Sequence, residues 1–444
     1  MAFRTFDPAT SLPDLSRRSL FRGGAGLAAF GALSTLPLGR QLLAHDASEA
    51  WPNVAALARR YLSEGKVANL FVTFGWGQED HVHTVGGGRL SLDGSTQVDE
   101  NSLYRIYSMT KPITGMATMM LVDEGALALD MPLYEVLPAY RDMMVQIEYD
   151  GAITPDNLVP AERPITIRQL LTHTAGLGYG IVQDGPIVEA YTERGLVPGQ
   201  VSRLPIPGIG RPEAVDSLEL FADRLAELPL VLQPGTKWSY SVALDLLGRV
   251  IEVASGKSFD AFLQERLFDP LGMESTFFRV PESEVGRFTD NYAVVNDKPL
   301  PIDPASMSVY LDEPAFPFGG AGLVSSPRDY DRFQRMLLGY GKLGDRRIMS
   351  ESAVRTGTSN ILPDTATTDG TWVAGQGFGA GGRVVGNSYG WGGAAGTLAS
   401  VDYDLGLRAG LYTQYMPSEA YPMREEFLAA YTADLEQMRQ QRAA

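Results

Sequence analysis

The chain has 444 residues, of which 44% are hydrophobic and 20% charged, and this globular composition provides material for a large core in one or two domains. Its formal net charge of −16 repels nucleic-acid phosphates and anionic lipids, so neither nucleic-acid binding nor stable membrane insertion is expected. It contains no cysteine, which excludes thiol nucleophiles, cysteine-ligated zinc and iron–sulfur clusters and suits passage through an oxidising compartment.

Residues 1–44 are typical of an export signal. The adjacent pair Arg17 and Arg18 precedes an uncharged, Gly/Ala-rich run over residues 23–38. A basic start before a short apolar stretch predicts a signal peptide, and the arginine pair indicates the twin-arginine type; the alternative is an unstructured basic leader. The run is too short for a membrane span of about 20 apolar residues. We therefore predict a signal peptide over residues 1–44, one domain over residues 45–444, and a periplasmic or secreted protein.

The first elements predicted after this leader are a helix and two paired strands. Apolar residues recur at helical spacing over residues 49–63. Residues 67–75 have the character of a strand, and residues 81–88, which end in three glycines, predict the return strand of a hairpin.

His81 and His83 on that return strand are the first candidate metal ligands. Residues two apart on a strand share a face, so both rings could reach one ion. Glu79 and Asp80 are the sole further donors nearby, and we therefore predict an exposed hairpin and no metal site.

Residues 108–124 form the clearest predicted helix. Pro112 falls in its first turn, where a missing N–H costs little, and Gly125 stands where a C-terminal cap is expected. The apolar residues of this helix line one face, and we interpret the methionine-rich stripe as core packing: Met109, Ile113, Met116 and Met120.

The start of this helix places a serine and a lysine one turn apart. Ser108 and Lys111 are three residues apart, so their Cβ atoms lie about 5–6 Å apart on one side of a helix, and the amine can reach the hydroxyl. A helix N-terminus also favours a developing oxyanion. A lysine amine serves as a base where burial or nearby positive charge lowers its pKa. Alone, the pair also fits an N-capping serine beside a solvated lysine.

The remaining elements predict an α+β fold. Residues 140–217, rich in proline and glycine, are interpreted as irregular connections and short helices over a cleft. Further along the chain we predict helices over residues 217–228 and 243–254, a helix start at Ser326-Pro327, strands over residues 377–415 and a closing helix over residues 418–441. Strands near both ends predict one sheet built from the two termini, with a helical region beside it.

Several motifs follow one another in a fixed order along the chain. They are Ser108-Met109-Thr110-Lys111, Leu170-Leu171-Thr172-His173-Thr174-Ala175-Gly176-Leu177, Tyr240-Ser241-Val242, Pro270-Leu271-Gly272-Met273, Gly319-Gly320-Ala321-Gly322-Leu323-Val324-Ser325 and Tyr389-Gly390-Trp391-Gly392-Gly393-Ala394-Ala395-Gly396. With these motifs, residues 49–440 resemble the serine β-lactamase-like superfamily: class C β-lactamases, D-alanyl-D-alanine peptidases and, most of all, family VIII carboxylesterases. The resemblance implies a β-lactamase/transpeptidase-like α+β fold, in which helices flank an antiparallel sheet and the site lies where an adjoining helical region meets it.

The resemblance also implies a role for each site residue. Ser108 would be the nucleophile, Lys111 its partner base, and Tyr240 the shared proton carrier that protonates the leaving group. The backbone N–H groups of Ser108 and Ala394 would form the oxyanion hole. No cofactor and no metal are implied.

Two departures from the β-lactamase pattern indicate the substrate class. Trp391-Gly392-Gly393 occupies the substrate-binding strand, where the glycines allow close approach to the backbone, but Trp391 replaces the lysine of Lys-Thr-Gly. Val242 replaces the asparagine of Tyr-x-Asn. These changes remove a cation and an amide that would hold an anionic β-lactam. We therefore predict a serine carboxylesterase that cleaves small uncharged esters through an acyl-enzyme.

Other functions stay open at this point. An amidase, a D-amino-acid peptidase or a β-lactamase would use the same groups, so the expected partner is a small ester or amide. A catalytically silent binding protein is disfavoured because Ser108, Lys111 and Tyr240 are all present. The pattern does not specify an oligomeric state.

Two residues resemble catalytic groups without the context for catalysis. Ser388 lies in a Gly-x-Ser-x-Gly match, but its flanks predict strand and no histidine follows His173, so we interpret the match as accidental. His173 itself is predicted to have a structural role beneath the site.

Overall fold

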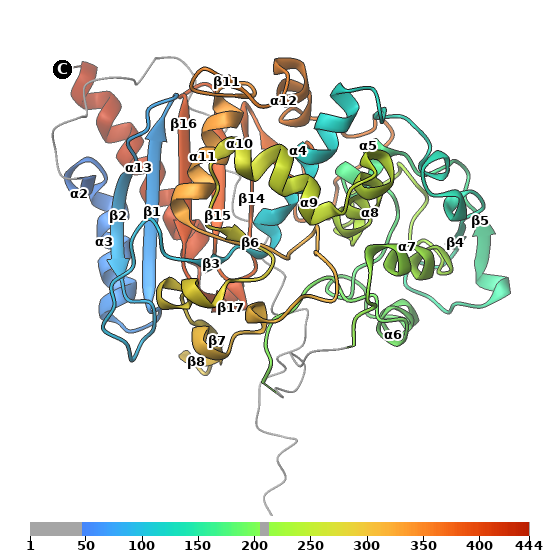
Figure 1. The fold of residues 1–444 in the computed structure, drawn as a ribbon, viewed down its shortest axis with the longest axis horizontal. Coiled ribbons are helices and arrows are strands. Elements are labelled where there is room, and N and C mark those ends of the chain that lie inside the picture. Colours follow the sequence, from blue (N-terminus) through green and yellow to red (C-terminus); the bar gives the residue numbers. More distant parts are fainter. Residues whose placement is uncertain (1–46, 205–212, 444) are drawn as a thin grey trace, which may run out of the picture.

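A seven-stranded antiparallel sheet joins the two ends of the part of the chain that the computed structural model describes, residues 47–204 and 213–443 (Figure 1). In spatial order its strands are β12 (Gly377–Phe378), β13 (Arg383–Val385), β14 (Ser388–Gly392), β15 (Leu398–Asp402), β16 (Leu407–Tyr412), β1 (Asn69–Trp76) and β2 (His83–Gly88). Strand β1 pairs with β16, with Phe71 opposite Tyr412. The predicted α+β fold and the sheet built from both termini are confirmed. The predicted signal peptide, residues 1–44, lies outside the described residues.

Each face of this sheet is covered by helices, because side chains along β1 point alternately to opposite faces. Phe74 packs in an apolar cluster with α3 (Pro52–Ser63) and α13 (Met423–Ala443). Phe71 packs in the larger cluster on the other face, which α11 (Pro327–Leu338) covers. No helix in the described residues has both the length and the apolar character needed to cross a bilayer.

Predicted helix starts agree with the structure where a capping serine marks them. The hydroxyl of Ser326 accepts a hydrogen bond from the backbone N–H of Asp329 at the start of α11, as the sequence predicts. The closing helix was predicted from residue 418, but α13 begins at Met423, directly after Pro422, which restricts the residue before it to extended backbone.

A helical region adjoins the sheet on the side of β12 and β14 (Figure 1). Its elements are α4 (Thr110–Asp123), β4 (Met144–Gln146), β5 (Leu158–Pro160), α5 (Ile167–Leu171), α6 (Pro186–Glu193), α7 (Leu218–Ala226) and α8 (Ala243–Ser255). The remaining elements are α2 (Ala47–Ala50), β3 (Tyr104–Arg105), α9 (Phe259–Leu263), α10 (Asp269–Leu271), β6 (Thr276–Phe277), β7 (Asn291–Val295), β8 (Lys298–Asp303), β9 (Val324–Ser325), β10 (Lys342–Leu343), β11 (Arg346–Arg347), α12 (Glu351–Gly357) and β17 (Tyr415–Met416). Residues 140–217 contain short elements, as predicted.

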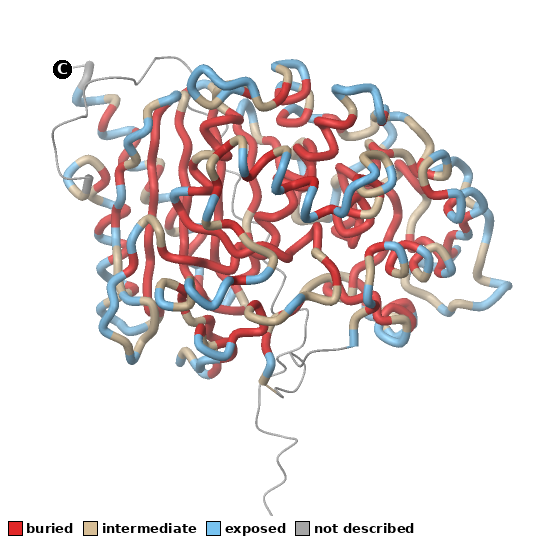
Figure 2. The backbone as a smooth tube through the Cα atoms, in the orientation of Figure 1, coloured by how far each residue is buried: buried red, intermediate tan, exposed pale blue. Residues whose placement is uncertain are grey.

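Helix α4 is the part of the helical region that lies against the sheet, and it is buried along almost its whole length (Figure 2). The sequence predicted one apolar face, whereas every residue from Thr110 to Leu121 is buried. The helix packs on α8 and α12 as well as near β14, so even its threonines face protein. These threonines find hydrogen-bond partners inside the fold; the Thr114 hydroxyl, for example, donates to the Gly319 carbonyl oxygen at 2.7 Å.

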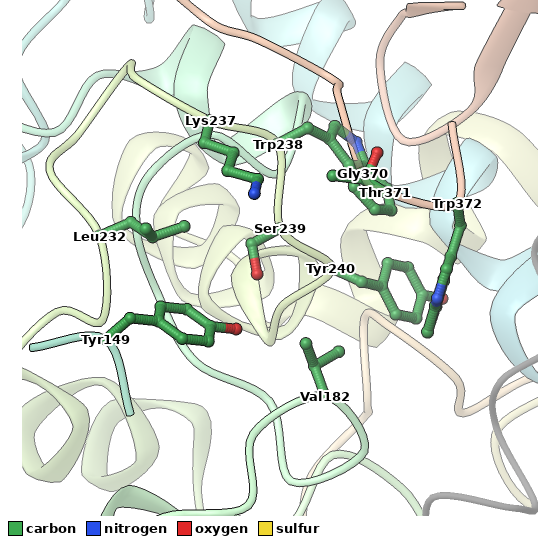
Figure 3. A pocket seen from close by; sticks show the side chains of 10 residues that line it. All are labelled: Tyr149, Val182, Leu232, Lys237, Trp238, Ser239, Tyr240, Gly370, Thr371 and Trp372. Carbon is green, nitrogen blue, oxygen red and sulfur yellow. The ribbon is translucent and has the colours of Figure 1, made fainter. Parts of the chain in front are cut away.

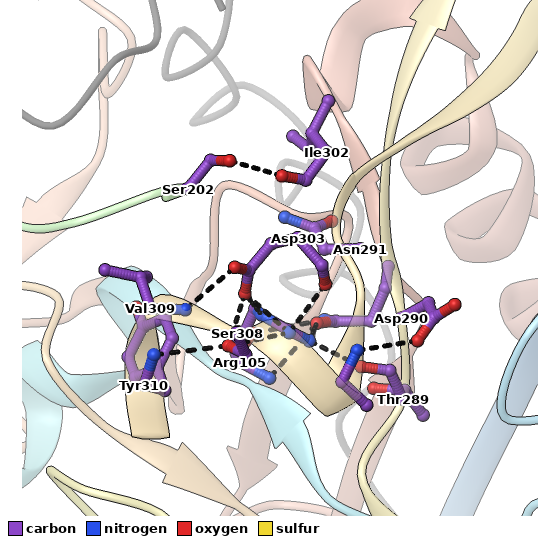
Figure 4. Close-up of polar contacts among 12 residues, drawn as sticks. Arg105, Ser202, Thr289, Asp290, Asn291, Ile302, Asp303, Ser308, Val309 and Tyr310 are labelled. Atoms are coloured by element: carbon purple, nitrogen blue, oxygen red, sulfur yellow. Dashed lines mark hydrogen bonds and ion pairs between the residues drawn. The ribbon is translucent and has the colours of Figure 1, made fainter. Parts of the chain in front are cut away.

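A buried ion pair fixes the segment that leads into α4 (Figure 4). Arg105, in β3, is fully buried, and its guanidinium lies 2.6 Å from the carboxylate of Asp303 at the end of β8. The same guanidinium donates to the backbone carbonyls of Thr289 and Asp303 and to the Ser308 hydroxyl. These bonds satisfy a charge that would otherwise be costly to bury, and they hold the backbone three residues before Ser108.

We expect Asp303→Ala to lower the free energy of unfolding by about 3–5 kcal/mol, because the Arg105 charge would stay buried without its partner. Urea denaturation followed by circular dichroism measures this loss. Glu351→Ala is the matched control, since it breaks an exposed pair with Arg355, for which about 0.5 kcal/mol is expected. Equal losses in the two variants would show that the buried pair does not organise this segment.

Candidate active site

Ser108 lies in a 3₁₀ helix, Tyr107–Met109, directly before α4 rather than inside it. Its hydroxyl oxygen is 3.1 Å from the amine nitrogen of Lys111, which belongs to the first turn of α4. The predicted approach of the two side chains is thus confirmed. Tyr107 has a φ of 41°, a left-handed conformation that a bulky residue rarely adopts, and such strain gathers at functional sites.

Tyr240 brings the third predicted group to the same oxygen. It lies just before α8, and its hydroxyl donates to the Ser108 hydroxyl oxygen at 2.8 Å. The amine of Lys111 stands 4.6 Å from the centre of the Tyr240 ring. All three predicted side chains therefore meet within hydrogen-bonding reach of one hydroxyl, and all three are buried.

Trp391 contacts Tyr240, a contact that the sequence did not predict. Its substrate-binding role stays a prediction; its side chain is buried, and the indole N–H donates to the Tyr240 hydroxyl oxygen at 3.2 Å. The indole thus holds the tyrosine hydroxyl from the side of β14. From the sequence, Trp391 was interpreted as the loss of a lysine, whereas in the structure it also supplies a hydrogen-bond donor.

A second contact of Lys111 reveals a residue that the sequence analysis missed. The amine also donates to the carbonyl oxygen of Gly320 at 2.8 Å. The N–H of the same glycine donates to the carboxylate of Asp245 at 2.8 Å. Asp245 is buried on α8, and a Cβ on Gly320 would lie 2.7 Å from its carboxylate oxygen. An acidic residue inside the apolar helix predicted over residues 243–254 was the available signal.

Burial raises the pKa of the Asp245 carboxyl to about 7, against the opposing effects of the Lys111 charge and the bond from Gly320. In an unfolded chain the value is about 3.9, so between about pH 4 and 7 the folded state binds more protons. The contribution of this group to the free energy of unfolding therefore falls as the pH rises through that window. Asp245→Asn removes the titration but keeps an acceptor for Gly320.

We therefore expect the stability of Asp245→Asn relative to the unmodified chain to increase between pH 4 and 8. The increase should reach a few kcal/mol, because one pKa unit corresponds to about 1.4 kcal/mol. Urea denaturation of both chains at several pH values measures the difference, in which other titrating groups cancel. A difference that does not change with pH would contradict a raised pKa at Asp245.

The two predicted oxyanion-hole residues, Ser108 and Ala394, belong to two segments that lie against each other. Ala394 follows β14, and a Cβ on Gly393 would lie 2.3 Å from the carbonyl oxygen of Ile106, two residues before Ser108. This close approach requires a glycine and brings the end of β14 against the serine segment. Within the described residues, the backbone N–H of neither Ser108 nor Ala394 donates to a protein carbonyl.

His173 supports the segment that carries Tyr240. Its Nδ1 accepts from the backbone N–H of Ser241, and its ring lies 4.8 Å from the Tyr240 ring. Burial, assisted by the charge of Lys111, lowers the pKa of His173 well below its usual value, so the ring is neutral. These contacts fit the structural role predicted for it.

The two remaining candidates lack the surroundings that chemistry needs. Ser388 lies within β14, and its hydroxyl donates to the carboxylate of Asp402 at 2.8 Å. It therefore does not stand on the exposed strand-to-helix turn that the Gly-x-Ser-x-Gly nucleophile requires. His83 was predicted on an exposed hairpin, but it is buried because its ring packs edge-on against Trp76. No group of three or more His, Cys, Asp or Glu in the described residues is placed to hold a metal.

A cavity of about 510 Å³ shares the Tyr240 ring with this site (Figure 3). Aromatic rings form much of its wall, and its lining comes from several parts of the chain: Tyr149, Val182, Leu232, Lys237 to Tyr240, and Gly370 to Trp372. Its size lies within the range of small-molecule sites, about 300–1,000 Å³.

A family model described as Beta-lactamase matches residues 54–433. The chain therefore belongs to the beta-lactamase family and is a serine hydrolase of this fold, which confirms the resemblance predicted from its motifs. It is 35% identical over 293 residues to Protein Rv1367c of Mycobacterium tuberculosis, covering 66% of this chain and 68% of that protein. It is 34% identical over 251 residues to Esterase EstB of Burkholderia gladioli, covering 52% and 55%.

Solved structures share the fold at lower sequence identity. EstCE1, described as a hydrolase with promiscuous acyltransferase activity, superposes with a TM-score of 0.68 at 21% identity, over 86% of this chain and 98% of that one. Simvastatin synthase (LovD) from Aspergillus terreus superposes with a TM-score of 0.69 at 21% identity, over 89% and 100%.

Proposed function

We propose that this protein is a carboxylesterase that cleaves small esters through an acyl-enzyme on Ser108. The observation that carries the proposal is the meeting of the Lys111 amine and the Tyr240 hydroxyl at the Ser108 hydroxyl, at 3.1 and 2.8 Å. A relative named as an esterase supports the choice of ester chemistry.

The acylation step requires the uncharged form of the Lys111 amine: the Ser108 oxygen forms a bond to the ester carbonyl carbon, and its proton passes to that amine. The carbonyl oxygen becomes an oxyanion that the N–H groups of Ser108 and Ala394 stabilise. The carbon–oxygen bond to the alcohol then breaks. Tyr240 donates its proton to the departing oxygen and regains one from Lys111. A water molecule then attacks the carbonyl carbon of the acyl-enzyme in the same way. The bond to the Ser108 oxygen breaks, the acid leaves, and Ser108 is restored.

The contacts beyond these three groups serve to position them. Gly320, held by Asp245, gives the Lys111 amine a second acceptor, and Trp391 directs a donor at Tyr240. Val242 and Trp391 replace the amide and the cation that would hold an anionic β-lactam, so we expect the acyl part of the substrate to be uncharged.

Labelling with a fluorophosphonate tests the nucleophile, because this reagent bonds covalently to an activated serine. Peptide mass spectrometry should find the label on Ser108, and Ser108→Ala should not react. Label on Ser388 would overturn the assignment. Hydrolysis of p-nitrophenyl butyrate beside a chromogenic cephalosporin then distinguishes ester from β-lactam chemistry, and faster cephalosporin turnover would favour a β-lactamase.

We also propose export by a twin-arginine route, on the basis of the sequence of residues 1–44 alone. Replacement of Arg17 and Arg18 by lysine should leave the full-length chain in the cytoplasmic fraction of an expressing bacterium. Unchanged amounts outside the cytoplasm would contradict this route.

A further inference from the structure

The cavity borders the ring of Tyr240, the residue that protonates the leaving alcohol in the proposed reaction. Tyr240 gives its proton to the oxygen of the departing alcohol, so the alcohol lies toward Tyr240 when the ester bond breaks. The Tyr240 ring forms part of the cavity wall (Figure 3), and Trp372 packs 5.3 Å from it, centre to centre. The cavity is therefore placed to receive the alcohol part of a substrate, an assignment that rests on the proposed function.

Two polar groups in this cavity have no protein partner. The amine of Lys237 points into the space between Leu232 and Ser239 (Figure 3). It forms no ion pair or side-chain hydrogen bond with any residue that the structure describes, and the hydroxyl of Ser239 forms none either. Lys111, by contrast, has two acceptors. A partly buried ammonium that no protein carboxylate neutralises can form a charge-assisted hydrogen bond with an anionic ligand.

The rest of the wall indicates what carries that anion. Trp238, Trp372, Tyr149 and Tyr240 present aromatic surface, which suits a flat or apolar group with one charged end. The chain as a whole carries a formal charge of −16, but exposed charges are screened beyond about 8 Å at physiological salt, so the nearby cation decides the local preference.

We propose that Lys237 determines specificity by binding a carboxylate on the leaving alcohol, so that the enzyme prefers esters of hydroxy acids to esters of neutral alcohols. Ser239 supplies a second donor to the same carboxylate, and the aromatic walls hold the body of the alcohol. The acyl part stays uncharged.

The test uses two acetyl esters of similar shape, 4-acetoxybenzoate with a carboxylate and 4-acetoxybenzamide with a neutral carboxamide, and compares how each responds to the same substitution. Lys237→Met should lower kcat/KM for the benzoate at least about tenfold, mainly through KM, and change the value for the benzamide less than about twofold. Lys237→Arg should keep most of the preference. Lys298→Met, on the exposed surface of β8, is the control that changes net charge by the same amount.

Two further measurements separate this proposal from the esterase assignment. Calorimetric titration with 4-hydroxybenzoate should show about tenfold weaker binding to Lys237→Met than to the unmodified chain, whether or not any ester is hydrolysed. Equal binding, or equal loss of activity on both esters, would overturn the role of Lys237. Mono-p-nitrophenyl glutarate carries its carboxylate on the acyl part. If Lys237→Met lowered kcat/KM for this ester as it does for the benzoate, Lys237 would not lie on the side of the leaving alcohol. Failure to hydrolyse either ester would reject the esterase function alone.

Discussion

Replacing Lys111 by methionine is expected to lower kcat about a thousandfold on every ester that the enzyme hydrolyses. The amine is the group placed to take the Ser108 proton, and a positioned base contributes about 10²–10⁴-fold to a rate. Methionine has nearly the same length and fits a buried position, so the fold should persist. Turnover of p-nitrophenyl butyrate and of ethyl butyrate measures the effect, and both rates should fall by a similar factor.

The matched control is Lys257→Met, which removes an exposed lysine paired with Glu265. It should change neither kcat nor the melting temperature appreciably. The rate of fluorophosphonate labelling provides a second reading, because it reports activation of the Ser108 oxygen without any leaving alcohol to protonate. Near-normal labelling and turnover in Lys111→Met would remove this lysine from the proton transfer.

The sequence predicted those parts of the site that depend on local geometry. Ser108 and Lys111 are three residues apart, so any helical conformation brings their side chains together. Tyr240 lies 132 residues after Ser108, and no periodicity could place it beside that serine. Its catalytic role was predicted from the resemblance to a known family. The sheet was predicted from strands near both ends of the chain, because strand character is also a local property.

Longer-range contacts were not predictable from local patterns. The Gly320 peptide joins Lys111 to Asp245, two residues that are far apart in the sequence, and such a relay depends on how α4, α8 and the loop before β9 pack. The 3₁₀ helix that holds Ser108 was also missed, since Tyr107 adopts a positive φ that its residue type does not announce. The direction of the Lys237 side chain was equally hidden, because the segment before Tyr240 is irregular.

Tyr240→Phe should also cost about three orders of magnitude in kcat, but with a dependence on the leaving alcohol that Lys111→Met does not show. The variant removes the hydroxyl that lies 2.8 Å from the Ser108 oxygen and keeps the ring, which packs against His173 and Trp372. An alkyl alkoxide is a poor leaving group and needs a proton as it departs, whereas p-nitrophenolate leaves readily without one. The loss on ethyl butyrate should therefore exceed the loss on p-nitrophenyl butyrate by at least about tenfold.

Trp391→Phe provides a graded version of the same experiment. It removes the indole N–H that donates to the Tyr240 hydroxyl oxygen at 3.2 Å and leaves the hydroxyl in place. One neutral hydrogen bond is worth about 1 kcal/mol, so a loss of about fivefold is expected, again larger for the alkyl ester. If Tyr240 instead activated Ser108 alone, Tyr240→Phe and Trp391→Phe would each slow both esters equally. A loss independent of the leaving alcohol would therefore assign the tyrosine to the attack on the carbonyl rather than to the departure of the alcohol.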